Sequence, residues 1–112
     1  MSKVITLTSQ NFEKEVLQFN GIVLVDFFAD WCGPCKLLAP ELEQLAKDLE
    51  SNSVIKIAKL NTETNQNLAI EYQIRSIPNI IMFKNGNVVQ QFIGLRNADF
   101  YKQVLLNEML SE

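Results

Sequence analysis

The order of hydrophobic and polar residues predicts that strands and helices alternate along the chain. Residues 4–7 form a short strand-like run, and residues 22–29 form a longer apolar run interrupted only by Asp26. A continuous run of β-branched and aromatic residues is typical of a central strand that is covered on both faces. Between the two runs, apolar residues at helical spacing predict a first helix capped by Ser9: Phe12, Val16 and Phe19.

A longer helix is predicted from Pro34 onward, with Pro40 inside it as the expected point of bending. Residues 53–60 predict the next strand, and residues 65–72 a short helix after it. A strand, a crossover helix and a second strand form a parallel pair with a right-handed connection. One side of the long helix is defined by four leucines: Leu38, Leu42, Leu45 and Leu49.

The end of the chain follows another pattern. Residues 80–83 and 88–93 flank Asn85-Gly86, a strong signal for a hairpin of two antiparallel strands. A last helix is predicted over residues 98–110, with Asn97 as its cap and three apolar residues facing inward: Phe100, Val104 and Leu105. The prediction is therefore one three-layer α/β domain over residues 1–112, with a βαβαβ unit, a hairpin and a final helix. Helices are expected on both faces of its mixed sheet.

Composition and charge narrow the classes of function. The 112 residues are 47% hydrophobic and 21% charged, with a net charge of −3, as in ordinary globular proteins. No cluster of lysines or arginines suggests a nucleic-acid partner. The run at residues 22–29 is too short to cross a membrane, and no signal-peptide pattern stands at the start. We therefore expect a cytoplasmic protein without a membrane partner.

The two cysteines, Cys32 and Cys35, have three possible roles. A metal site normally needs four strong ligands, and the chain has no histidine and no third cysteine, although two chains could pool their thiolates. A structural disulfide closing so short a loop would stabilise the fold by about 2 kcal/mol, against about 3 for a fifteen-residue loop. Both redox forms should then be folded, as a reversible dithiol switch requires. The redox role is the interpretation that the spacing favours.

The position of the pair predicts which thiol reacts first. Pro34 suits the first turn of a helix, so Cys32 should lie just before it, facing unpaired backbone N–H groups and the positive end of the helix dipole. This position stabilises a thiolate by about 0.3–2 kcal/mol. Cys35, one turn into the helix, should be more buried and remain protonated. Cys32 is therefore predicted to be the nucleophile and Cys35 the resolving thiol.

Three neighbouring features each allow a structural and a functional interpretation. Asp26, inside an apolar strand, should have a raised pKa, either as a buried polar group satisfied by its neighbours or as a proton acceptor. Ile77-Pro78 is by general statistics a trans bond in a turn before a strand. Trp31 is either an exposed aromatic without a special role or part of a contact surface.

The order of three motifs resembles the thioredoxin family over nearly the whole chain: "WCGPC" after a hydrophobic strand, "RSIP" about forty residues later, and "FKNG". The resemblance implies the thioredoxin fold and a protein-disulfide reductase with a redox-active Cys32–Cys35 disulfide and no bound cofactor or metal. Gly33 and Pro34 resemble the dipeptide of the reducing members. Asp26 would deprotonate Cys35, and Lys59 would approach Asp26.

The resemblance also implies a substrate site. The Ile77-Pro78 bond would be cis and lie beside the cysteines, and the backbone of Ile77 would pair with an extended substrate segment. A shallow apolar groove around Cys32 would be completed by Trp31, Gly33 and Gly94. Implied partners are an NADPH-dependent thioredoxin reductase and disulfide-containing clients such as ribonucleotide reductase, peroxiredoxin and methionine sulfoxide reductase, with the chain acting as a monomer.

The chain departs from the usual pattern of the family at Asn79, Phe28, Gln73 and the loop at Gly94. Asn79 and this loop are expected to flank the docking surface and to affect partner preference. Gln73 would cost about 1 kcal/mol if its φ is positive. Two other functions stay open at this point: a non-catalytic binding module in which the cysteines are incidental, and an oxidase or isomerase.

Overall fold

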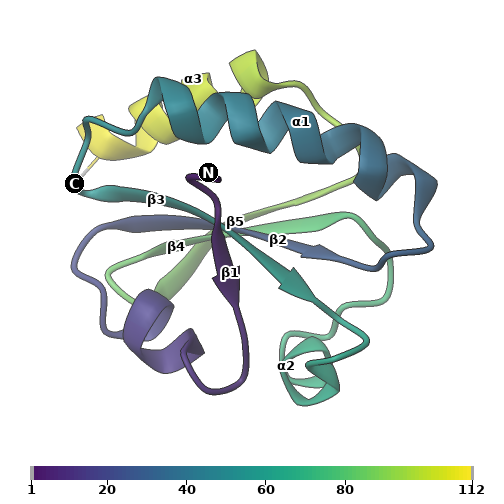
Figure 1. Cartoon of the computed structure of the whole chain (residues 1–112). Helices are drawn as coiled ribbons and strands as arrows, with labels where there is room; N and C mark the ends of the chain where they lie inside the picture. Colours follow the sequence, from purple (N-terminus) through teal and green to yellow (C-terminus); the bar gives the residue numbers. More distant parts are fainter. Residues whose placement is uncertain (1, 112) are drawn as a thin grey trace.

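The computed structural model describes residues 2–111 and contains a five-stranded mixed sheet with the order β1-β3-β2-β4-β5 (Figure 1). The chain forms these elements in turn: β1 (Ile5–Leu7), η1 (Glu13–Leu17), β2 (Ile22–Phe28), α1 (Gly33–Asp48), β3 (Ile55–Asn61), α2 (Gln66–Glu71), β4 (Asn79–Lys84), β5 (Asn87–Ile93) and α3 (Ala98–Leu110). This is the predicted three-layer α/β fold.

Strand β2 is the centre of the sheet. It pairs with β3 in parallel and with β4 in antiparallel orientation, and β1 pairs with β3 in parallel. Six of its seven residues are buried, from Ile22 to Phe27. The prediction of a strand covered on both faces is confirmed, because layers of helices lie above and below it (Figure 1).

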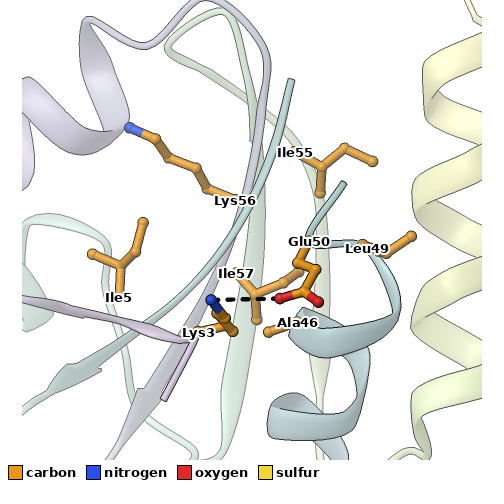
Figure 2. Close-up of a pocket in the computed structure, with 8 residues that line it drawn as sticks. All are labelled: Lys3, Ile5, Ala46, Leu49, Glu50, Ile55, Lys56 and Ile57. Atoms are coloured by element: carbon orange, nitrogen blue, oxygen red, sulfur yellow. Dashed lines mark ion pairs between the residues drawn. The ribbon is translucent and has the colours of Figure 1, made fainter. Parts of the chain in front are cut away.

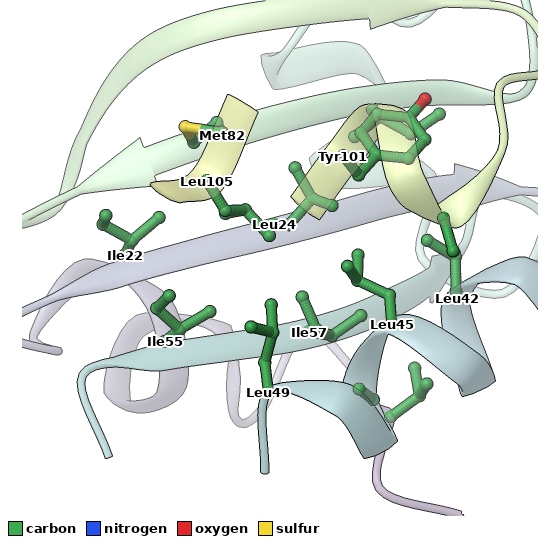
Figure 3. Close-up of a cluster of buried hydrophobic side chains, with 14 of the residues drawn as sticks. Ile22, Leu24, Leu42, Leu45, Leu49, Ile55, Ile57, Met82, Tyr101 and Leu105 are labelled. Carbon is green, nitrogen blue, oxygen red and sulfur yellow. The ribbon is translucent and has the colours of Figure 1, made fainter. Parts of the chain in front are cut away.

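Helices α1 and α3 cover one face of the sheet, and η1 and α2 cover the other (Figure 1). The first layer packs on alternate residues of the strands, including Ile22 and Leu24 of β2 (Figure 3). The intervening residues of β2 face the second layer with Phe12 and Val16. Because side chains alternate across a strand, Asp26 falls on the same face as Leu24, under α1 and α3.

Helix α1 is built as its sequence predicts. Cys32 is the residue before the first turn, Pro34 lies within that turn, and Pro40 occupies an exposed position in the middle. Burial of one side of the helix holds it against the sheet. The four predicted leucines are all buried: Leu38, Leu42, Leu45 and Leu49.

The hairpin and the last helix also follow their local signals. Asn85 and Gly86 have φ of 52° and 83°, as a two-residue turn between antiparallel strands requires. A β-carbon on Gly86 would collide with the carbonyl oxygen of Leu17, so only glycine fits there. Asn97 caps α3, since its side chain accepts a hydrogen bond of 2.9 Å from the backbone N–H of Phe100.

Two local predictions are wrong. Ser9 does not cap the first helix, which is a single π-helical turn; its backbone N–H and hydroxyl donate instead to Asn65 Oδ1, at 2.9 and 3.3 Å. Phe100 does not face inward but is 36% exposed, and the neighbouring Tyr101 is fully buried in its place. For Ser9, a partner 56 positions away decides the outcome.

Candidate functional site

Cys32 and Cys35 form a disulfide at the start of α1, with their Cα atoms 5.2 Å apart. Cys32 has the extended backbone of a capping residue, with φ of −83° and ψ of 113°. Its Sγ accepts a hydrogen bond of 3.2 Å from the backbone N–H of Cys35. The sulfur therefore takes the place of a capping oxygen at the positive end of the helix.

The two cysteines are equally buried, each 4% exposed. The expectation that Cys35 would be the more buried of the two is wrong for the disulfide form. Closing so short a ring places each sulfur against the other, and the carbonyl oxygen of Ile77 lies 3.8 Å from Cys32 Sγ. The neighbouring Trp31 is 70% exposed, and Gly33 is exposed beside it.

Two further segments meet Cys32 at this end of the sheet. The Ile77-Pro78 bond is cis, and the carbonyl oxygen of Pro78 accepts a hydrogen bond of 2.9 Å from the backbone N–H of Gly94. Gly94, after β5, has a φ of 99°, which favours glycine. Within residues 2–111, Ile77 takes part in none of the backbone hydrogen bonds of the turns and loops. The loop before β4, the end of β5 and the start of α1 thus converge.

Asp26 is a buried carboxyl group, 4% exposed, at the carboxyl end of β2. Burial raises the pKa of Asp26 from 3.8 to about 7, and the charge of Lys59 partly opposes the rise. Lys59 is the register partner of Asp26 on β3 and is half-buried. Asp26 Oδ1 has no hydrogen-bond partner within residues 2–111. A carboxyl group in this state can exchange a proton near neutral pH.

Asp26 and Cys35 lie on surfaces that face each other. Cys35 belongs to the buried side of α1 together with Leu38 and Leu42, and this side packs on the face of the sheet that carries Leu24 and Asp26. A cavity of about 140 Å³ lies beside Cys35, lined also by Phe28, Ala29, Asp30, Lys36 and Ala39. The layer between the sheet and the first turns of α1 therefore holds both groups.

The departures from the family pattern have separate structural positions. Asn79 is only 2% exposed, and its Oδ1 accepts a hydrogen bond of 2.9 Å from Gln91 Nε2. Its side chain therefore joins β4 to β5, and its effect on partner preference stays a prediction. Gln73 has a φ of 55°, so the condition for its predicted cost is met. Phe28 is half-buried and lines the cavity beside Cys35.

A second cavity has a volume of about 300 Å³, and Figure 2 shows the residues around it. It is lined by residues of β1, β3 and the carboxyl end of α1, where Lys3 and Glu50 form an ion pair of 3.5 Å. A 16-residue helix is about 24 Å long. The cavity is thus separated from Cys32 by the length of α1 and is not part of the same site.

One buried group near Asp26 was missed by the sequence analysis. Tyr101 is a fully buried residue on the inner face of α3, and its hydroxyl has no hydrogen-bond partner within residues 2–111. Its spacing of four residues from Leu105 is the signal that would have placed it on the inner face of the helix. Its hydroxyl is a polar atom on an otherwise apolar helix face.

Two further properties bear on the class of site. Within residues 2–111, no group of three or more histidine, cysteine, aspartate or glutamate side chains is arranged to hold a metal ion. None of the helices in the same range is both long enough and apolar enough to span a membrane.

Comparison with known proteins agrees with the geometry of this site. The family model described as Thioredoxin matches residues 3–107. A protein named Thioredoxin from Buchnera aphidicola subsp. Schizaphis graminum is 50% identical over 84% of this chain and 85% of its own length. Proteins of the same name from Chlorobaculum thiosulfatiphilum and Rickettsia felis are 49% and 47% identical, over 82% and 83% of this chain and 83% and 87% of their own lengths. The chain belongs to the thioredoxin family, and its Cys32–Cys35 pair makes it a thiol–disulfide oxidoreductase.

Proposed function

We propose that the chain works as a reductase of disulfides in protein substrates. The observation that carries this proposal is the position of Cys32 Sγ, which accepts the backbone N–H of Cys35 at the start of α1. In the dithiol form the same N–H and the helix dipole would stabilise a thiolate on Cys32. A thiolate is the species that attacks a disulfide.

The exchange has two steps. The Cys32 thiolate attacks one sulfur of the substrate disulfide, so that a mixed disulfide forms and the other substrate sulfur leaves as a thiolate that takes up a proton. Cys35 then loses its proton and attacks Cys32 Sγ, which forms the Cys32–Cys35 disulfide and releases the second substrate thiol. Two electrons pass from the cysteine pair to the substrate.

Asp26 is the proposed acceptor of the Cys35 proton. Its position on the sheet face opposite Cys35 and its pKa of about 7 support this role, because a base works best when its pKa is near the working pH. Lys59, on the neighbouring strand, favours the ionised form of Asp26 by its charge. Replacing Asp26 by asparagine should slow the release step more than the first attack, as single-turnover kinetics would measure.

The surface around Cys32 is the proposed substrate site. The backbone of Ile77, which makes no backbone–backbone hydrogen bond in the loops of residues 2–111, would bond to an extended substrate segment in the manner of an added strand. Exposed Trp31 would supply apolar contact area, while Gly33 and Gly94 would let the segment approach closely. Pro78 would hold this loop in place through its bond to Gly94.

The proposal includes a route for regeneration. An NADPH-dependent thioredoxin reductase would return the disulfide to the dithiol, and the clients would include ribonucleotide reductase, peroxiredoxin and methionine sulfoxide reductase. No bound cofactor is needed, since the cysteine pair itself carries the electrons. A monomer in the cytoplasm is the form in which we propose that it works, because a recycled reductant needs a reducing compartment.

Reduction of insulin disulfides with dithiothreitol tests the function. The wild-type chain should accelerate it, Cys32→Ser should abolish the acceleration, and Cys35→Ser should accumulate a mixed disulfide. If the double serine variant kept its role in the cell, the chain would instead be a binding module with incidental cysteines. A reduction potential close to about −120 mV, as in periplasmic oxidants, would contradict both the reductase and the cytoplasmic assignment.

A further inference from the structure

Two buried oxygens without partners lie in the same layer of the molecule. Among the side chains of residues 2–111, only Asp26 Oδ1 and the Tyr101 hydroxyl are buried polar atoms that lack a hydrogen bond. An unsatisfied buried polar atom is costly and therefore rare. Two of them in one layer suggest that they are related to each other.

The strand pairing places Asp26 on the face of the sheet that Tyr101 covers. Ile22 and Leu24 of β2 face the layer of α1 and α3, and Asp26 continues this side of the strand. Its partner across β4, Ile80, belongs to the same buried cluster as Tyr101. Figure 3 shows the ring of Tyr101 beyond Leu24 in the direction in which β2 runs, and Asp26 follows Leu24 by about 6.6 Å along the strand.

The ring of Tyr101 is held by its neighbours. It makes edge contacts with the rings of Phe92 and Phe100, whose centroids lie 5.9 and 5.3 Å away. The guanidinium of Arg96 in turn lies 5.2 Å from the centroid of the Phe100 ring. These contacts hold the ring of Tyr101 in place.

The proton of the Tyr101 hydroxyl needs a hydrogen-bond acceptor. Of the two charged groups that act on this hydroxyl, Arg96 and Asp26, only Asp26 can accept. Burial raises the pKa of Tyr101 to about 12, and Arg96 opposes the rise by its charge and by donating toward the hydroxyl oxygen. Because a guanidinium only donates hydrogen bonds, the hydroxyl proton still has no acceptor there. The carboxylate of Asp26 acts in the opposite direction and adds to the rise. Asp26 Oδ1 is the buried acceptor that still lacks a donor within residues 2–111.

We propose that Tyr101 is a positioning residue for the disulfide exchange: its hydroxyl donates toward the ionised carboxylate of Asp26, directly or through one water, and favours the form that accepts the Cys35 proton. This rests on the proposed role of Asp26. The charged and titratable groups around Asp26 are Lys59 on β3, Tyr101 on α3, Arg96 before α3 and, in the dithiol form, Cys35 on α1. On α1, Glu41 accepts a bond of 2.7 Å from the backbone N–H of Ala98.

The titration of Asp26 tests the proposal without any substrate. The midpoint is followed by the 13C shift of the Asp26 carboxyl in reduced wild-type protein, in Tyr101→Phe and in Tyr72→Phe. Phenylalanine keeps the ring and removes only the oxygen, and Tyr72, the second tyrosine, packs on the other face of the sheet. A hydrogen bond to a charged group favours that form, so Tyr101→Phe should raise the midpoint by roughly 1 pH unit and Tyr72→Phe should leave it unchanged.

The pH profile of the release step gives the second readout. Tyr101→Phe should slow this step severalfold near pH 7 and match the wild type near pH 9, where Asp26 is ionised in both proteins. In the Asp26→Asn background the same substitution should have no effect on the profile. A midpoint that stays unchanged or falls in Tyr101→Phe would overturn the inference. Loss of insulin reduction in the wild type would overturn the proposed function and leave the titration result valid.

Discussion

At Asp26, the burial of one carboxyl group connects the stability of the fold to its chemistry. The pKa of this group is raised to about 7 because the surrounding layer desolvates it. Between pH 4 and pH 7 the folded protein therefore holds a proton that the unfolded chain has released. The ionised form of Asp26 therefore lowers the stability of the fold, while the proposed function uses this form as the proton acceptor for Cys35.

Asp26→Asn should stabilise the protein in a pH-dependent manner. The stability linked to Asp26 is fully present below pH 3.8 and is lost as the pH rises through about 7. At about 1.4 kcal/mol per pH unit, the loss approaches roughly 4 kcal/mol. Urea unfolding at pH 4.5, 6 and 8 should show that the free energy of unfolding of Asp26→Asn exceeds that of the wild type by more at each higher pH. Exposed Asp30→Asn is the matched control, and a gain independent of pH would contradict the explanation.

Gln73 carries a backbone strain that glycine would relieve. Its φ of 55° lies in the left-handed region, which costs an ordinary residue about 1–2 kcal/mol. Gln73→Gly should therefore raise the free energy of unfolding by about 0.5–1 kcal/mol after the entropy cost of glycine. The matched change Gln103→Gly, at an exposed position inside α3, should lower it by about 1 kcal/mol. Equal losses in the two variants, measured by urea unfolding, would show that the turn is unstrained.

At the scale of elements, helix ends carry both the chemistry and part of the stability. The start of α1 is capped by the sulfur of Cys32, which the reaction uses, whereas the start of α3 is capped only by structural groups. Asn97 supplies one of them, and Glu41 supplies the other by bonding the backbone N–H of Ala98. The second bond joins α1 to α3 beside the layer that holds Asp26 and Tyr101.

Asn97→Ala should lower the free energy of unfolding by about 1 kcal/mol, because the backbone N–H of Phe100 loses its acceptor. Asn107→Ala, at an exposed position inside the same helix, should leave it unchanged or raise it slightly, since alanine has the higher helix propensity. Thermal and urea unfolding of both variants measure the difference. Similar losses in the two variants would mean that the cap is not a stabilising contact.

For the whole molecule, the two clusters on either side of the sheet supply the stability, and the disulfide adds little. Each face is covered by its own layer of buried side chains, of which Figure 3 shows the one under α1 and α3. The Cys32–Cys35 ring encloses only the two residues between the cysteines. The site lies at one end of these layers, where chain segments meet without providing much of the core. The redox state can therefore change while the fold persists.

Reduction of the disulfide should lower the free energy of unfolding by about 2 kcal/mol and leave unfolding cooperative. The oxidised and dithiothreitol-reduced proteins should give parallel urea transitions, followed by the fluorescence of Trp31. The double serine variant of the cysteine pair serves as the control that cannot re-oxidise. A reduced form that unfolds gradually would show that the fold depends on the disulfide after all.

Predictions that depend on local chemistry agree with the structure. The continuous apolar run of β2, the leucines of α1, the Asn85-Gly86 turn and the Asn97 cap depend on periodicity or on residues a few positions apart. Local signals failed where a distant partner decides the outcome, whereas the family resemblance correctly placed a cis Ile77-Pro78 bond beside the cysteines. Ser9 bonds Asn65, which is 56 positions away, instead of capping the first helix. Asn79 bonds Gln91 on the neighbouring strand, a contact that no local pattern indicates.

The sequence by itself determined the order of strands and helices and placed a reactive pair of thiols before a helix, because side-chain period and short spacings are local properties of the chain. Only the tertiary structure decided that Ile77 lies against Cys32 from 45 positions away, and that Tyr101 shares a buried layer with Asp26. Such meetings depend on the order of the strands and on which helix covers which face. No single segment of the sequence determines the strand order or the placement of the helices, because both result from packing all of the apolar faces together.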